Sequence, residues 1–222
     1  MLQPSTLTFL SDLKANNNKP WFDANRLVYE AARNNFIDLV ARLLEGINTI
    51  DPAISETALQ AKSCIFRINR DVRFSTDKSP YKSYFGAWFN AGGKQSPTAG
   101  YYLDLRPGGS FVAGGLYMPD AAILATIRQE IDYNLANFEQ ILTQPAFVKQ
   151  LGELNRDEVL QRPPKGYDAS NPAIEYLKLK SFTASRQLPD SALTKPDLVK
   201  QILTTFSSLQ PLITYLNTAV VP

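Results

Sequence analysis

The residues best suited to chemistry lie in one basic segment, residues 67–82. It reads Arg-Ile-Asn-Arg-Asp-Val-Arg-Phe-Ser-Thr-Asp-Lys-Ser-Pro-Tyr-Lys. Its five bases and two acids give a local charge of +3, whereas the whole chain carries +2. Positive charge is therefore concentrated in this segment rather than spread along the chain, which favours contact with an anion.

The three arginines of this segment are spaced by three residues and can converge if the segment curls. Planar guanidinium groups bind phosphate or carboxylate through paired hydrogen bonds. We therefore expect the segment to bind a phosphorylated or other anionic ligand: the arginines clamp the anion, the acids orient them, the lysines add charge, and the tyrosine offers a hydrogen bond or a stacking face. The expected ligand-binding residues are Arg67, Asn69, Arg70, Asp71, Arg73, Asp77, Lys78, Tyr81 and Lys82.

Two other functions fit the same residues. In a metal-assisted phosphoester hydrolase, Asp71 or Asp77 would hold a hydrated Mg²⁺ and the arginines would stabilise the transition state. In a structural or interaction protein, the charges would form a brace of salt bridges that holds a long loop on the sheet. Binding alone needs no cofactor, and no set of metal ligands is predicted.

Aromatic residues interleaved with bases raise nucleic acid as an alternative partner. Such residues on a sheet face can stack the bases of a single strand. Cross-strand aromatic pairs also stabilise sheets without a ligand, and a sequence pI of 8.6 is modest for a nucleic-acid binder. We therefore favour the structural interpretation for Tyr81, Tyr84, Trp88, Tyr101 and Tyr102, which accompany Lys82 and Arg106.

The composition excludes several classes of protein. No histidine is present, which excludes Ser-His-Asp and Cys-His catalysis and His-ligated zinc. The single cysteine, Cys64, excludes an intrachain disulfide and is expected to be buried. No apolar run is long enough to span a membrane and no signal peptide is evident, so we expect a cytoplasmic protein without a membrane partner.

The periodicity predicts an α+β fold. A long amphipathic helix should begin at Pro20 and end near Gly46, with Ser5 opening a shorter helix before it. The middle of the chain predicts an antiparallel β-meander sheet, flanked by this long N-terminal helix and by C-terminal helices in a single domain, residues 1–222. Strands are expected at 64–69, 81–90, 100–106, 110–117 and 178–183, and C-terminal helices at 120–131, 135–142, 172–177 and 197–219, the last interrupted at Pro211.

The basic segment also resembles a known family signature. The string from Phe66 to Ser75 and the string from Asp77 to Lys82 are similar to those of the domain of unknown function 2461 family. Further similar strings occur at 9–10, 16–19, 21–26, 114–119 and 164–167, so the resemblance covers residues 5–215. It implies one α+β domain of bacterial type and implies no activity. Two positions depart from the family: Ala113 replaces a frequent third glycine, and Asn171 stands where histidine is expected.

Overall fold

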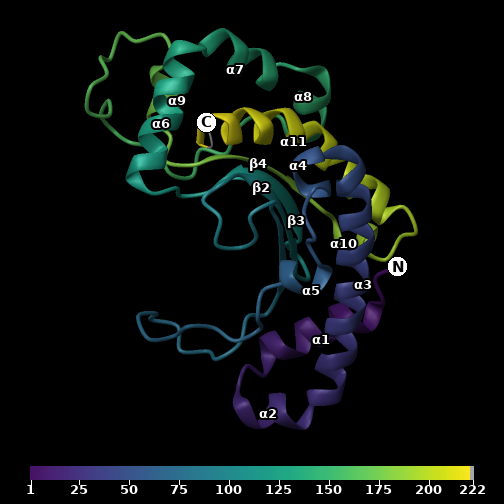
Figure 1. Cartoon of the computed structure of the whole chain (residues 1–222). Helices are drawn as coiled ribbons and strands as arrows, with labels where there is room; N and C mark the ends of the chain where they lie inside the picture. The colour runs from purple at the N-terminus through teal and green to yellow at the C-terminus, as the bar shows by residue number, and fades with distance from the viewer. Residues whose placement is uncertain (221–222) are drawn as a thin grey trace. The chain divides into compact units, whose positions relative to one another are not determined.

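The computed structural model describes residues 1–220, which form an α+β fold (Figure 1). Four strands are present among them: β1 (Phe85–Phe89), β2 (Gly100–Leu105), β3 (Phe111–Leu116) and β4 (Phe182–Gln187). The helices before the sheet are α1 (Pro4–Ala15), α2 (Lys19–Ala24), α3 (Arg26–Ile50), α4 (Pro52–Ser55) and α5 (Ala61–Cys64). Those after β3 are α6 (Ala121–Tyr133), α7 (Leu135–Leu142), α8 (Pro145–Leu151), α9 (Ile174–Leu177), α10 (Asp190–Leu193) and α11 (Leu198–Val220).

The strands form one antiparallel sheet in the order β1-β2-β3-β4, which confirms the predicted meander. The strand predicted at 64–69 is wrong. Its buried residues are Cys64, Ile65 and Ile68, two of them adjacent and the third after two exposed residues, a pattern without the alternation of a paired strand. The segment forms only two isolated antiparallel bridges, Ile65 with Ala87 and Asn69 with Tyr81. The fourth strand is β4, which begins four residues later than predicted for 178–183.

The described chain consists of two compact units, and each is described separately. Unit 1 comprises residues 1–89, 102–112 and 187–203, and unit 2 comprises residues 90–101, 113–186 and 204–220. The residues of β2, β3 and β4 are divided between the two units. A single domain over the whole chain stays a prediction. No helix within residues 1–220 combines the length and the apolar character needed to cross a lipid bilayer.

Unit 1 is built around the predicted amphipathic helix, which is α3. Its apolar stripe is buried, and the ring of Phe36 stacks on Phe85 of β1 at 5.2 Å between centroids. The helix starts at Arg26 rather than Pro20, because a break separates it from α2. At the break, the Asn25 side chain donates to the Trp21 carbonyl at 2.9 Å and competes with the helical backbone bonds. Ser5 lies within α1, whose N-cap is Gln3.

In unit 2, the C-terminal part of α11 packs on the core. Phe206 packs against Tyr101 of β2 at 5.0 Å between ring centroids. The predicted interruption at Pro211 is wrong, since the helix continues through it; Leu209 and Leu212 on either side are fully buried and hold both halves on the core. In β3, Gly115 has a φ of 121° and lies against the backbone of Phe182 in β4.

Candidate functional site

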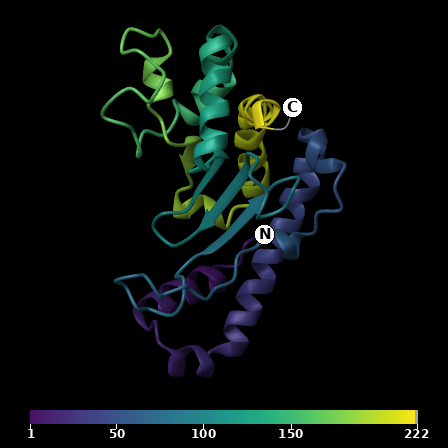
Figure 2. The ribbon, with the colours of Figure 1, turned by 60° about the vertical axis from the view of Figure 1, so that its left-hand side comes forward.

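The basic segment forms an extended loop beside α1 in unit 1 (Figure 2). Arg70 closes the base of this loop, because its guanidinium forms an ion pair with Asp77 and donates to Ser79 Oγ at 2.6 Å and Ser75 Oγ at 3.3 Å. The hydrogen bond from Arg70, followed by those from Ser79, lowers the pKa of Asp77 below its usual value. Arg70 is thus held by groups of its own loop.

A second ion pair forms nearer the loop tip. Arg73 binds Asp71 through two parallel hydrogen bonds, with Nε to Oδ1 at 3.0 Å and Nη2 to Oδ2 at 2.6 Å. This pair is exposed, so its contribution to stability is small. Lys78 donates to the Val72 carbonyl at 3.0 Å. Phe74, which lies between Val72 and Lys78 in the sequence, is 96% exposed.

The end of the loop is anchored through Tyr81 on α2 and on the turn between α1 and α2. The side-chain amide of Asn17 donates to the Tyr81 carbonyl at 2.9 Å and accepts from the Tyr81 N–H at 3.1 Å, as a neighbouring strand would. The ring of Tyr81 stacks on Phe22 at 4.0 Å between centroids and is 7% exposed. Trp21, Phe22 and Tyr29 also contact one another or Phe9, so these rings form packing contacts.

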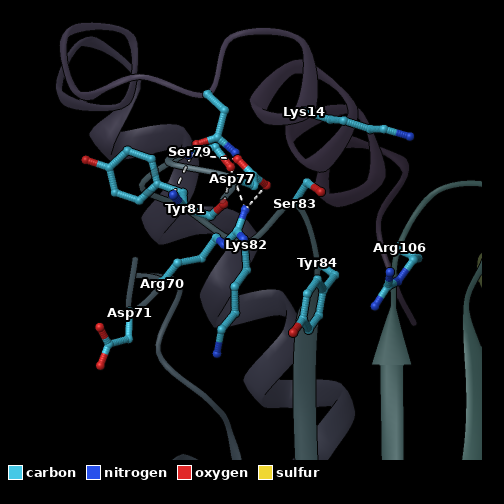
Figure 3. Close-up of a pocket in the computed structure, with 11 residues that line it drawn as sticks. Lys14, Arg70, Asp71, Asp77, Ser79, Tyr81, Lys82, Ser83, Tyr84 and Arg106 are labelled. Carbon is cyan, nitrogen blue, oxygen red and sulfur yellow. Dashed lines mark hydrogen bonds and ion pairs between the residues drawn. The ribbon is translucent and has the colours of Figure 1, made fainter. Parts of the chain in front are cut away.

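A cavity of about 560 Å³ lies between this loop, α1 and the sheet edge, within unit 1. Figure 3 shows the residues around it. Every lining residue carries a polar or charged group, which suits a hydrophilic ligand more than an apolar one. The lining residues are Lys14, Asn17, Arg70, Asp71, Asp77, Ser79, Tyr81, Lys82, Ser83, Tyr84 and Arg106.

The residues that line the cavity carry excess positive charge. Four of them are basic, Lys14, Arg70, Lys82 and Arg106, and two are acidic, Asp71 and Asp77, which gives a formal charge of +2. Arg70 and Arg106 form ion pairs with Asp77 and Asp104, and Arg73 beside the cavity pairs with Asp71. An anion that enters this cavity would therefore meet an attractive field.

Tyr84 lies between two cations in the cavity wall (Figure 3). The Arg106 guanidinium lies 4.3 Å from the Tyr84 ring centroid, and the Lys82 ammonium lies 6.0 Å from it, both within the range of cation–π attraction. The Lys82 ammonium and the Tyr84 hydroxyl point in the same direction. Together they form a cationic group with an adjacent hydroxyl, an arrangement that can bind a phosphoryl oxygen.

Arg106 is held in place from behind by a buried carboxylate. Asp104, 1% exposed, accepts from Arg106 Nε at 2.5 Å and from Nη2 at 2.6 Å, and it also accepts from the Tyr102 hydroxyl at 3.1 Å. Burial, followed by the Asp104 charge, raises the pKa of Tyr102, so this hydroxyl remains a donor at neutral pH. The guanidinium is therefore preorganised on the Tyr84 ring.

The structure brings together part of the predicted set. Of those residues, Arg70, Asp71, Asp77, Tyr81 and Lys82 line the cavity. The cavity lining does not include Arg67, Asn69, Arg73 and Lys78. Sequence reasoning did not include Lys14, Asn17, Ser79, Ser83, Tyr84 and Arg106 in the site. Tyr84 and Arg106 carried a signal, because both had been noted among the interleaved aromatic and basic residues.

The two acids of the loop do not form part of a larger carboxylate cluster. Within residues 1–220, no group of three or more acidic or cysteine side chains is placed to hold a metal ion. Asp71 and Asp77 each face an arginine instead. Cys64 is buried, as expected, and its thiol lies 3.5 Å from the Gln60 carbonyl.

Residues 5–215 match the family described as "Conserved hypothetical protein (DUF2461)". The chain belongs to this family. The match spans the whole basic loop and all four strands, and it confirms the resemblance of the sequence strings. No curated protein and no solved structure matches the chain. Asn171, at the position expected to be histidine in this family, donates to Asp132 at 2.6 Å within unit 2.

Proposed function

We propose that this member of the family binds a phosphorylated or other anionic ligand in the cavity of unit 1. The observation that carries this proposal is the formal charge of +2 on the lining of the cavity, to which Lys14 and Lys82 contribute beside two arginines held in ion pairs. In this proposal the principal contacts come from Lys82, which the sequence predicted, and from Tyr84 and Arg106, which were not in the predicted set. The cytoplasmic location expected from the sequence is part of this proposal.

In this proposal the basic loop serves both as part of an anion site and as a structural brace. Arg70 acts as a brace, since its guanidinium is engaged by Asp77, Ser75 and Ser79. The brace closes the loop on itself and thereby shapes one wall of the cavity, while Asn17 and Tyr81 attach the loop to the α1–α2 turn. Arg70 is therefore a positioning residue, and Lys82 is the residue whose charge the ligand would meet.

Inorganic phosphate provides the simplest test of this proposal. Titration calorimetry at low ionic strength should show saturable binding to the wild type and at least about tenfold weaker binding to Lys82→Gln. Arg67→Gln is the matched control, because it removes one charge from the same segment outside the cavity lining. Equal weakening in both variants would indicate a general charge effect, and an unchanged affinity in Lys82→Gln would refute the proposed site.

A further inference from the structure

We infer that the anion bound by this cavity is a phosphorylated polyol, such as a sugar phosphate, and that the site has no place for a nucleobase. This inference rests on the proposed function and names the ligand class within it. It depends on three features of the lining: the ring faces, the hydroxyl groups and the volume.

The aromatic rings of the lining offer no open face to a base. Tyr81 is 7% exposed, and one face of its ring is covered by Phe22 at 4.0 Å. Tyr84 has the Arg106 guanidinium on one side and the Lys82 side chain on the other (Figure 3). Sites that bind bases usually stack them on aromatic faces, and these two rings are poorly placed for that contact.

The polar groups of the lining suit a ligand with several hydroxyls. Ser83 and Tyr84 line the cavity, and each carries a hydroxyl that can donate to or accept from a ligand. Asp77 adds a carboxylate whose side chain is 59% exposed and whose pKa is lowered by its hydrogen bonds, so it is ionised at neutral pH. A carboxylate repels a bare phosphate but accepts hydrogen bonds from hydroxyls, which favours a ligand that carries both groups.

The volume also exceeds what an inorganic anion requires. A cavity of about 560 Å³ lies within the range of small-molecule sites, roughly 300–1,000 Å³. Phosphate alone would leave most of this space to water. A phosphorylated polyol could place its phosphoryl group at Lys82 and Tyr84 and its hydroxyls toward Ser83 and Asp77.

Three probes test the inference: ribose 5-phosphate, inorganic phosphate and adenosine 5′-monophosphate, titrated at one ionic strength. In the monophosphate a base replaces the anomeric hydroxyl of ribose 5-phosphate, so the pair compares a base with a hydroxyl on the same sugar phosphate. Ribose 5-phosphate should bind about tenfold more tightly than phosphate, and the added base should give no gain in affinity. The Ser83→Ala variant should lower the affinity for ribose 5-phosphate severalfold while that for phosphate is unchanged.

The outcomes separate this inference from the proposed function. Tighter binding of the nucleotide, or equal binding of ribose 5-phosphate and phosphate, would overturn the polyol inference while the anion site stands, provided that Lys82→Gln still weakens binding. An absence of binding for all three probes would overturn both. Retention of the ribose 5-phosphate preference in both Ser83→Ala and Tyr84→Phe would also contradict the assigned hydroxyl contacts.

Discussion

The side chain of Asn17 forms two hydrogen bonds with the backbone of Tyr81, 64 residues later in the chain. One amide thus satisfies both the N–H and the C=O at the point where the basic loop meets α1. It replaces the neighbouring strand that would otherwise pair with this backbone. The relationship explains how a long charged loop can form one wall of a cavity.

Replacement of Asn17 should therefore destabilise the loop. In Asn17→Ala, two backbone groups at the partly buried Tyr81 lose their partners, which should cost about 1–3 kcal/mol in the free energy of unfolding. Asn16→Ala is a matched control, since Asn16 makes only an exposed hydrogen bond to the Asp12 carbonyl. Urea denaturation of both variants measures the difference, and equal stability would contradict the assigned role.

Arg70 should act through loop order. Arg70→Ala removes hydrogen bonds to Ser75 and Ser79 together with the ion pair to Asp77, and should cost roughly 1 kcal/mol because the site is partly solvated. For a chain of this length, that corresponds to a fall in melting temperature of about 2–4 °C. Limited proteolysis should show faster cleavage within residues 71–79. Arg73→Ala, which breaks only an exposed pair, should leave the melting temperature close to that of the wild type.

The Arg70–Asp77 pair should also give a specific pH dependence. Hydrogen bonds from Arg70 and Ser79 lower the pKa of Asp77 below its ordinary 3.8. A carboxyl group with a lowered pKa in the folded state stabilises the protein above its unfolded pKa, and the stabilisation is lost as the pH falls toward the folded pKa. The stability difference between the wild type and Asp77→Asn should thus be full at pH 7 and shrink below about pH 4. A difference that is constant down to pH 2 would contradict this linkage.

Two glycines with positive φ should respond differently to alanine. A Cβ at Gly115 would lie 2.0 Å from the Phe182 carbonyl oxygen, whereas one at Gly108 would meet no atom within 4 Å. Gly108→Ala should cost only the backbone strain, about 1–2 kcal/mol. Gly115→Ala must also separate β3 from β4 and should cost more than that or prevent folding. Thermal denaturation of Gly108→Ala and Gly115→Ala measures the difference in stability. Equal melting temperatures would contradict the close contact between Gly115 and Phe182.

The sequence predicted the fold class better than the exact elements. The buried stripe of α3 and the turn-linked strands β2 and β3 follow local patterns of periodicity and glycine, and these were confirmed. The strand expected at 64–69 was not, because pairing depends on partners that a local pattern cannot reveal. Pro211 was predicted to interrupt the last helix, because proline usually breaks a helix. Packing on both sides of Pro211 maintains α11 instead.

The candidate site was predictable only where its residues are adjacent in sequence. Lys82, Tyr81 and Arg70 belong to one charged string, so their types and spacing drew attention to them. Lys14 and Arg106 come from distant segments, and their proximity to this string is a property of the fold. The ion pairs of Arg70 with Asp77 and of Arg106 with Asp104 likewise depend on the fold and cannot be read from a local sequence pattern.

The most direct test of the central claim is to locate phosphate on the protein by NMR. A ¹⁵N-labelled sample is titrated with sodium phosphate at constant ionic strength, with sodium chloride as the control anion. The account predicts saturable shifts of the backbone amides of Lys82, Ser83, Tyr84 and Arg106 with one common dissociation constant, absent in Lys82→Gln. Shifts confined to other parts of the chain, or none that saturate, would contradict an anion site in this cavity.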